Sequence, residues 1–267
     1  MSDTEEKEMS FLDHLEVLRW HLVRSSSAIL IFAILAFVYK DIVFDHIILA
    51  QKNSDFFTYR LFCDISEKIG KGDLLCFSDI KFSLINLTMS GQFTIHIITS
   101  IIAGIVLAFP YLLFEIWRFI RPALHKNERR YATSLILSGS LLFLIGILFG
   151  YYFISPLSVQ FLGNYQVSEL VQNQISIQSF ISTVTTLTLA CGLVFELPLL
   201  VYFLSKMGIL TPEVMRKYRK IAIVVTLILS AVITPPDVTS QILLTVPLLL
   251  LYELSIFISK VVTKNKD

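Results

Sequence analysis

Glu196 is the residue best placed to do chemistry, because it is a carboxylate inside a long uncharged run. Residues 170–195 carry no charge, and Leu-Pro-Leu-Leu follows directly at 197–200. A charge in hydrocarbon costs about 2.5 kcal/mol or more, so this carboxylate has to face protein or water. Steps of three and four residues place Gly192, Thr188, Thr185 and Ser182 on the same helical face. We predict that this stripe lines a wet cavity; the alternative is a tight helix–helix seam around one buried, protonated glutamate.

Motifs of enzyme active sites are lacking. The sequence contains no P-loop, no H-E-x-x-H zinc site, no G-x-S-x-G and no glycine-rich nucleotide fingerprint. His96 stands alone in an apolar segment and is interpreted as a hydrogen-bonded packing residue. We therefore expect no enzyme activity, metal, cofactor or nucleic-acid partner, and any work that the protein does must draw on another source of energy.

A second group of candidate residues lies in the segment from Glu115 to Tyr131. This segment combines five lysines and arginines with aromatic, proline and acidic side chains: Trp117, Phe119, Pro122 and Glu128. The cations are explained by orientation in a membrane, but Glu128 is not. It either pairs with its neighbours Arg129 and Arg130 or is offered to a cationic partner.

Long uncharged runs must position these residues. The chain has 267 residues, of which 55% are hydrophobic and only 16% charged, against about 25% charged in a typical soluble domain. A span needs roughly 20 mostly apolar residues. The sequence predicts an all-α integral membrane protein, a single domain over 1–267, with six spans near 23–41, 92–115, 132–154, 179–205, 220–235 and 239–258.

The distribution of lysine and arginine orients these spans. The N-terminal segment and the C-terminal tail hold three each, and the loops after the second and fourth spans hold five each. The loops after the third and fifth spans hold none. The loop over 42–91 is mixed in charge, but long loops cross membranes largely regardless of charge. Both termini are therefore predicted to be cytoplasmic.

The N-terminal segment is predicted to form an amphipathic helix in the cytoplasmic interface. Ser10 can cap it, and leucines at 12, 15, 18 and 22 recur at spacings of three and four. The residues before it are mainly acidic, unlike a cleavable secretory leader, so the first apolar segment is expected to stay.

The last two spans are expected to be short. Residues 221–236 and 238–252 hold sixteen and fifteen uncharged residues, or about 24 and 22 Å of helix. Local thinning of the bilayer would accommodate them. Alternatively, Lys220 and Glu253 extend to the interfaces and the spans are nearly normal.

The three cysteines are assigned by location. Cys63 and Cys76 lie in the loop predicted to be outside the cytoplasm, where they form either a disulfide or two free thiols. Cys191 lies in an apolar run and is expected to be a small core residue. The loop itself carries no motif that assigns it a role.

Four ordered motifs resemble the TatC family, the receptor subunit of twin-arginine protein translocation. They are Phe-Leu-Asp-His-Leu-Glu-Val-Leu-Arg at 11–19, Phe-Pro at 109–110 with Trp-Arg-Phe-Ile-Arg-Pro-Ala-Leu at 117–124 and Asn-Glu-Arg-Arg at 127–130, Phe-Glu-Leu-Pro at 195–198, and Thr-Pro-Pro-Asp-Val-Thr-Ser-Gln at 234–241. They cover most of the chain.

The resemblance implies a receptor in the bacterial cytoplasmic membrane for signal peptides that carry two consecutive arginines. It assigns Glu128 to the arginine pair, Glu196 to a concave intramembrane face and Arg19 to a functional role. Trp117, Phe119 and Pro122 would support the site, and Asp237 and Gln241 would belong to the last periplasmic turn. It also implies transport driven by the proton-motive force, together with single-span partners of the TatA and TatB type and other TatC copies.

One position departs from the family pattern. The family motif usually has glutamate directly before Leu-Arg, where this chain has Val17. Glu16 lies one residue earlier, turned by about 100° around the helix. Either the helix rotates so that Glu16 serves, or Glu128 carries more of the recognition.

Two other functional classes were weighed. A proton-coupled secondary transporter could use Glu196 as its proton site, but such carriers often show internal repeats, and spans one to three do not resemble spans four to six. An intramembrane hydrolase would need a nucleophile and a base, and the sequence offers no recognisable pair.

Overall fold

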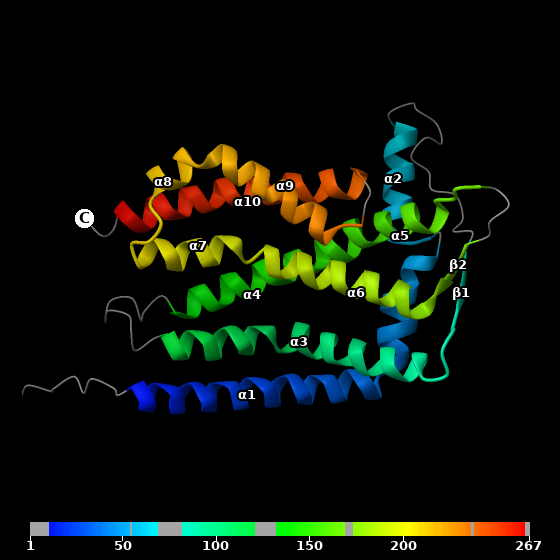
Figure 1. The fold of residues 1–267 in the computed structure, drawn as a ribbon, viewed down its shortest axis with the longest axis horizontal. Helices are drawn as coiled ribbons and strands as arrows, with labels where there is room; N and C mark the ends of the chain where they lie inside the picture. Colours follow the sequence, from blue (N-terminus) through cyan, green and yellow to red (C-terminus); the bar gives the residue numbers. More distant parts are fainter. Residues whose placement is uncertain are drawn as a thin grey trace, which may run out of the picture. The chain divides into compact units, whose positions relative to one another are not determined.

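Long apolar helices make up most of the chain in the computed structural model (Figure 1), which describes residues 11–53, 55–68, 82–120, 132–168, 173–235 and 238–264. The residues form two compact units. The first comprises Met1–Val38 and Ser100–Ser140, and the second comprises Tyr39–Thr99 and Leu141–Asp267.

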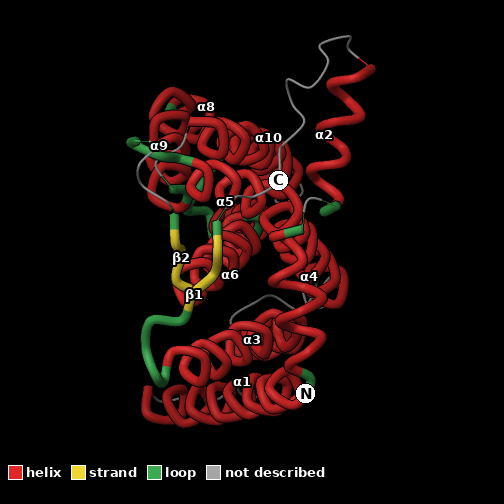
Figure 2. Tube along the Cα trace, turned by 90° about the vertical axis from the view of Figure 1, so that its right-hand side faces the viewer, coloured by secondary structure: helices red, strands yellow, loops and turns green. Residues whose placement is uncertain are grey.

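The elements follow one another as helices with one small pair of strands. The α-helices are α1 Phe11–Val38, α2 Phe57–Lys68, α3 Gly91–Ile120, α4 Ala132–Phe149, α5 Ser155–Asn164, α6 Ile177–Val194, α7 Leu197–Lys206, α8 Pro212–Lys217, α9 Arg219–Ile233 and α10 Val238–Lys264. Two π-helices, η1 Ile42–Ile48 and η6 Gly150–Ile154, and a 3-10 helix, η2 Leu49–Lys52, join them. Strands β1 Ser83–Ile85 and β2 Gln174–Ser176 pair in parallel (Figure 2), which the all-helical prediction did not include.

Five stretches of the described residues are long and apolar enough to cross a membrane: Leu15–Val38, Gly91–Ile120, Thr133–Asn164, Ile177–Lys206 and Ser240–Lys264. They correspond to the first four predicted spans and the sixth. Helix α9 stands where the fifth is expected, and its 15 residues extend about 22 Å. This length agrees with the short fifth span that the sequence predicts.

The sixth helix differs from its prediction. Helix α10 has 27 residues and continues to Lys264, beyond the predicted end of the span at 258. Its uncharged part before Glu253 is no longer than the sequence predicts, and the Glu253 carboxylate pairs with Arg219 at the start of α9.

Helix α1 also runs further than expected. It extends without a break from Phe11 to Val38, so the predicted amphipathic segment is the first part of the spanning helix and not a separate element. Ser10, the predicted cap, lies outside the described residues.

The sequence predicted that the third span ends at 154, before Pro156, but the helix continues beyond this proline. Helix α4 passes through η6 into α5, with Pro156 in the first turn of α5. Proline has no N–H to donate to the preceding turn, so carbonyls at this level need other donors. Gln51 Nε2 donates to the Tyr151 carbonyl at 2.9 Å, and the Thr58 hydroxyl donates to the Tyr152 carbonyl.

The segment that supplies these donors is itself held by hydrogen bonds. The Ser155 hydroxyl donates to Gln51 Oε1 at 2.7 Å. The Tyr59 hydroxyl lies 3.2 Å from the carbonyl oxygens of both Gln51 and Pro156. Burial raises the pKa of Tyr59 above its usual range, so the hydroxyl remains a neutral donor.

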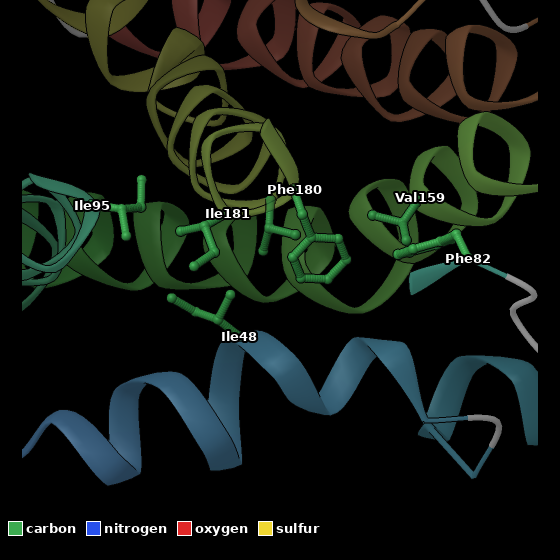
Figure 3. Close-up of a cluster of buried hydrophobic side chains, with 7 residues drawn as sticks. Ile48, Phe82, Ile95, Val159, Phe180 and Ile181 are labelled. Atoms are coloured by element: carbon green, nitrogen blue, oxygen red, sulfur yellow. The ribbon is translucent and has the colours of Figure 1, made fainter. Parts of the chain in front are cut away.

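The same segment and residues after it contribute to an apolar core of the second unit (Figure 3). Ile48 comes from η1, Phe82 precedes β1, and both pack with buried side chains of the spanning helices: Ile95, Val159, Phe180, Ile181 and Val184. Residues 42–68 and 82–85, in the loop for which the sequence assigned no role, thus fasten to the helices through apolar contacts, backbone carbonyls and the β1–β2 pair.

Thr58→Val should lower the stability of the protein, because it leaves the Tyr152 carbonyl without its side-chain donor at nearly unchanged volume. A buried polar group that loses its partner costs about 1–3 kcal/mol. Unfolding of the purified protein in detergent, followed by circular dichroism, measures the loss. Thr58→Ser keeps the hydroxyl and serves as the control; equal melting of the two variants would contradict the assignment.

Candidate functional site

Helices α1 and α3 approach each other closely in the first unit. A Cβ atom at Gly104 would lie 2.7 Å from the Ile29 carbonyl oxygen and 2.9 Å from Ala33 Cβ. Glycine at 104 therefore permits this spacing, as small residues do where membrane helices pack. The contact brings the polar side chains further along the two helices within reach of each other.

Those polar side chains gather around the buried Glu115, which is 1% exposed. Its carboxylate accepts from Arg24 Nε at 3.1 Å and from the Tyr111 hydroxyl at 2.8 Å, and it also contacts His21 Nδ1. We call His21, Arg24, Tyr111 and Glu115 the Glu115 cluster. Because a buried carboxylate is costly without partners, these bonds specify how α1 and α3 pair.

His21 contacts both Glu115 and Arg24 within the cluster. Its Nδ1 atom also lies 3.1 Å from Arg24 Nη2. A protonated Nδ1 donates to Glu115, whereas a deprotonated Nδ1 accepts from Arg24. The cluster thus retains internal hydrogen bonds in either form of the imidazole.

Sequence reasoning missed the Glu115 cluster. It placed Arg24 at the start of the first span and Glu115 at the start of the segment after the second, and it did not connect the two residues. The sequence does contain a signal for it: Glu115 ends one apolar run, and His21 and Arg24 stand three residues apart at the start of another. That spacing places His21 and Arg24 on one helical face.

Of the predicted recognition residues, Phe119 contacts this cluster. The ring of Phe119 meets the ring of His21 edge to face, with centroids 5.9 Å apart. Trp117 is buried at 5% exposure. Glu16 and Arg19 are exposed near the start of α1, whereas Val17 is half-buried. Pro122 and Glu128 lie outside the described residues.

Glu196 occupies the junction between α6 and α7 in the second unit. Both carboxylate oxygens are shielded from solvent and, within the described residues, make no hydrogen bond of normal geometry. The backbone of Phe143 in α4 lies near the carboxylate.

The polar stripe before Glu196 is partly a packed seam. Gly146 and Gly150, one turn apart, face α6: added Cβ atoms there would lie 2.9 Å from Gly192 Cα and from Thr188 Cα, respectively. Thr185 donates to the Ile181 carbonyl at 2.7 Å. The seam interpretation thus fits the middle of the stripe.

The remaining candidates are spread over other elements. Ser182 is exposed on α6. Gln241 Nε2 reaches the Leu227 carbonyl at 3.4 Å and so joins α10 to α9, while Asp237 lies outside the described residues. Cys63 is disulfide-bonded and Cys191 is a buried free thiol. Cys76 lies outside the described residues, and its pairing stays a prediction.

Among the described residues, no group of three or more histidine, cysteine, aspartate or glutamate side chains is placed to hold a metal. What the first unit offers is an exposed glutamate and arginine on α1, held beside an aromatic end of α3.

A family model described as Sec-independent protein translocase protein (TatC) matches residues 13–247. The chain belongs to the TatC family. It is therefore a component of a protein translocase.

Individual relatives match over nearly the whole chain. The TatC protein of Blattabacterium from Periplaneta americana is 37% identical, with 98% of this chain and 99% of the relative covered. That of Aquifex aeolicus is 36% identical, with 97% and 98% covered. Two crystal structures of the twin-arginine translocase receptor TatC also match. The first is 34% identical with a TM-score of 0.66, and the match covers 94% of this chain and 99% of that one. The second, in DDM, is 36% identical with a TM-score of 0.70, and the match covers 91% of this chain and 98% of that one.

Arg24→Met and Glu115→Gln should be coupled in stability. Either substitution alone removes a partner from the Glu115 cluster, so the double variant should cost less than the sum of the two single costs by about 0.5–3 kcal/mol. Unfolding in detergent with increasing SDS, followed by the fluorescence of Trp117 and Trp20, measures the three free energies.

Arg118→Met combined with Glu115→Gln is the matched control, because Arg118 is exposed on α3. Its effect should simply add to that of Glu115→Gln. Strict additivity for the Arg24 pair would show that the cluster does not act as a unit.

Proposed function

We propose that this TatC family member is the core receptor of the twin-arginine translocase and binds the twin-arginine signal peptides of folded precursors at its cytoplasmic face. Glu128 receives the arginine pair, with Arg19 and Glu16 on α1 beside it. Trp117, Phe119 and Pro122 support the loop that carries Glu128. The observation that carries the proposal is the Glu115 cluster.

The cluster supports the proposal because it joins the two segments that have to meet in the site. Glu16 and Arg19 lie five and two residues before His21 on α1, and α3 ends at Ile120, five residues after Glu115. Bonds between His21, Arg24 and Glu115 hold the start of α1 beside the end of α3. A site shared by the N-terminal segment and the loop after α3 then needs little further ordering when it binds.

Charge pairing alone is too weak for a receptor. An exposed arginine–glutamate pair contributes about 0.2–1 kcal/mol, whereas micromolar binding needs about 8 kcal/mol. The apolar part of the signal peptide must therefore also be buried. Of the stripe on α6, we assign this contact to the exposed Ser182, because Thr185 is buried and Thr188 and Glu196 lie at the seam with α4.

The wider assembly follows from the same proposal. Both termini face the cytoplasm of a bacterium, six helices cross its inner membrane, and Asp237 and Gln241 belong to the last periplasmic turn. Partners are single-span proteins of the TatA and TatB type and other TatC copies. The proton-motive force drives transport, in keeping with a sequence that has no nucleotide-binding motif.

Glu128→Ala should abolish photocrosslinking of a twin-arginine precursor to membranes that contain this chain, because the arginine pair loses its carboxylate. Glu213→Ala, which removes an exposed acid on α8, is the control and should crosslink normally. Undiminished crosslinking with Glu128→Ala would contradict the site. A precursor in which lysines replace both arginines should also crosslink poorly, since lysine cannot present the planar fork.

Val17→Glu should tighten precursor binding if the family position remains in reach of the signal peptide. Val17 is half-buried and Glu16 exposed, so Glu16→Ala is the informative comparison. Crosslinking yield at limiting precursor measures both. If Val17→Glu has no effect while Glu16→Ala weakens binding, Glu16 is the carboxylate that this chain uses.

A further inference from the structure

A charged cavity at one end of α9 and α10 lies outside the proposed recognition site. It measures about 360 Å³ and is lined by residues of α8, α9 and α10 (Figure 1): Arg216, Arg219, Glu253, Ile256, Phe257 and Lys260. Three cations face one carboxylate, so the cavity is positively charged. The lysine and arginine distribution predicts that this end of the helices faces the cytoplasm.

The single carboxylate in the cavity is already engaged. Arg219 donates through Nε to Glu253 Oε1 at 2.6 Å and through Nη2 to Oε2. Such a two-pronged bond satisfies both oxygens. In the part of the chain that the structure describes, Arg216 and Lys260 make no ion pair. An anion that enters the cavity therefore meets two cations that are not neutralised.

The depth of the cavity suits a lipid headgroup. Helix α9 has 15 residues and extends about 22 Å from the turn that joins it to α10. Helix α10 covers a similar distance from that turn between Val238 and Glu253. The hydrocarbon of a bilayer is about 30 Å thick. Arg219 and Glu253 thus lie at a depth that an undisturbed bilayer would fill with acyl chains, and polar groups have to reach inward to them.

An apolar track leads from the cavity along α10. Val246, Leu250 and Phe257 are 52%, 65% and 63% exposed. Together with Glu253 they recur at steps of four, three and four residues, which places them on one face of the helix. A headgroup in the cavity would have acyl chains that fit against this face.

We propose that the cavity binds the phosphodiester headgroup of an anionic phospholipid. The phosphate lies between Arg216 and Lys260, and the acyl chains follow Leu250 and Val246 toward the outer surface. Basic pockets between spanning helices on the cytoplasmic side bind anionic headgroups in other membrane proteins. The bound lipid holds the inner leaflet close to the short helix α9, independently of signal-peptide binding.

Native mass spectrometry of the full-length protein tests the proposal. The delipidated protein in detergent is titrated with dioleoyl-phosphatidylglycerol or dioleoyl-phosphatidylcholine. Wild type should retain the phosphatidylglycerol preferentially, and Arg216→Gln with Lys260→Gln should weaken its binding by about tenfold or more. Lys217→Gln with Lys220→Gln, which removes the same charge from neighbouring positions that do not line the cavity, should change it less than about twofold.

Further arms separate the alternatives. Glu253→Gln should bind phosphatidylglycerol more tightly, because Arg219 is freed. Equal weakening by the two double variants would mean diffuse attraction and would overturn the site. Displacement of the lipid by millimolar inorganic phosphate would identify a free anion as the ligand instead. Normal lipid retention by Arg216→Gln with Lys260→Gln, together with lost precursor transport, would point to a protein contact and reject the lipid.

Discussion

The constraint behind this structure is that hydrocarbon contains no water to satisfy polar groups. Each polar atom placed among apolar helices therefore needs a partner within the protein. The Glu115 carboxylate finds an arginine, a histidine and a tyrosine, and the carbonyls next to Pro156 find Gln51 and Thr58. Because such partners come from distant parts of the sequence, they decide which helices pair and at which level.

Glu196 is one of several buried polar side chains that have no hydrogen bond of normal geometry among the described residues, together with Thr99, Ser140 and Thr188. A buried polar group in this state favours an incoming polar ligand. The tight approach of Gly146 and Gly150 to α6 provides the rigid support that such a residue needs.

The same constraint explains which helices could be predicted from the sequence and which features could not. Uncharged runs located the first four spans and the short α9, because the cost of charge in hydrocarbon acts on each segment by itself. The sequence could not reveal that Glu253 pairs with Arg219, or that the chain continues as helix through Pro156. In both places the partner is a side chain far away in the sequence. The Glu115 cluster was missed for the same reason, whereas the uncharged run around Glu196 was enough to single out that residue.

The hydrogen bonds around Pro156 also bear on the order in which the protein is made. Gln51 and Thr58 precede the third span in the chain, so a ribosome releases them before Tyr151 and Tyr152 are synthesised. If the loop over 42–91 is on the far side of the membrane, these donors have already been translocated when the carbonyls arrive. The carbonyls of η6 can then accept hydrogen bonds from Gln51 and Thr58 as soon as they are inserted, so they need not remain without donors in lipid.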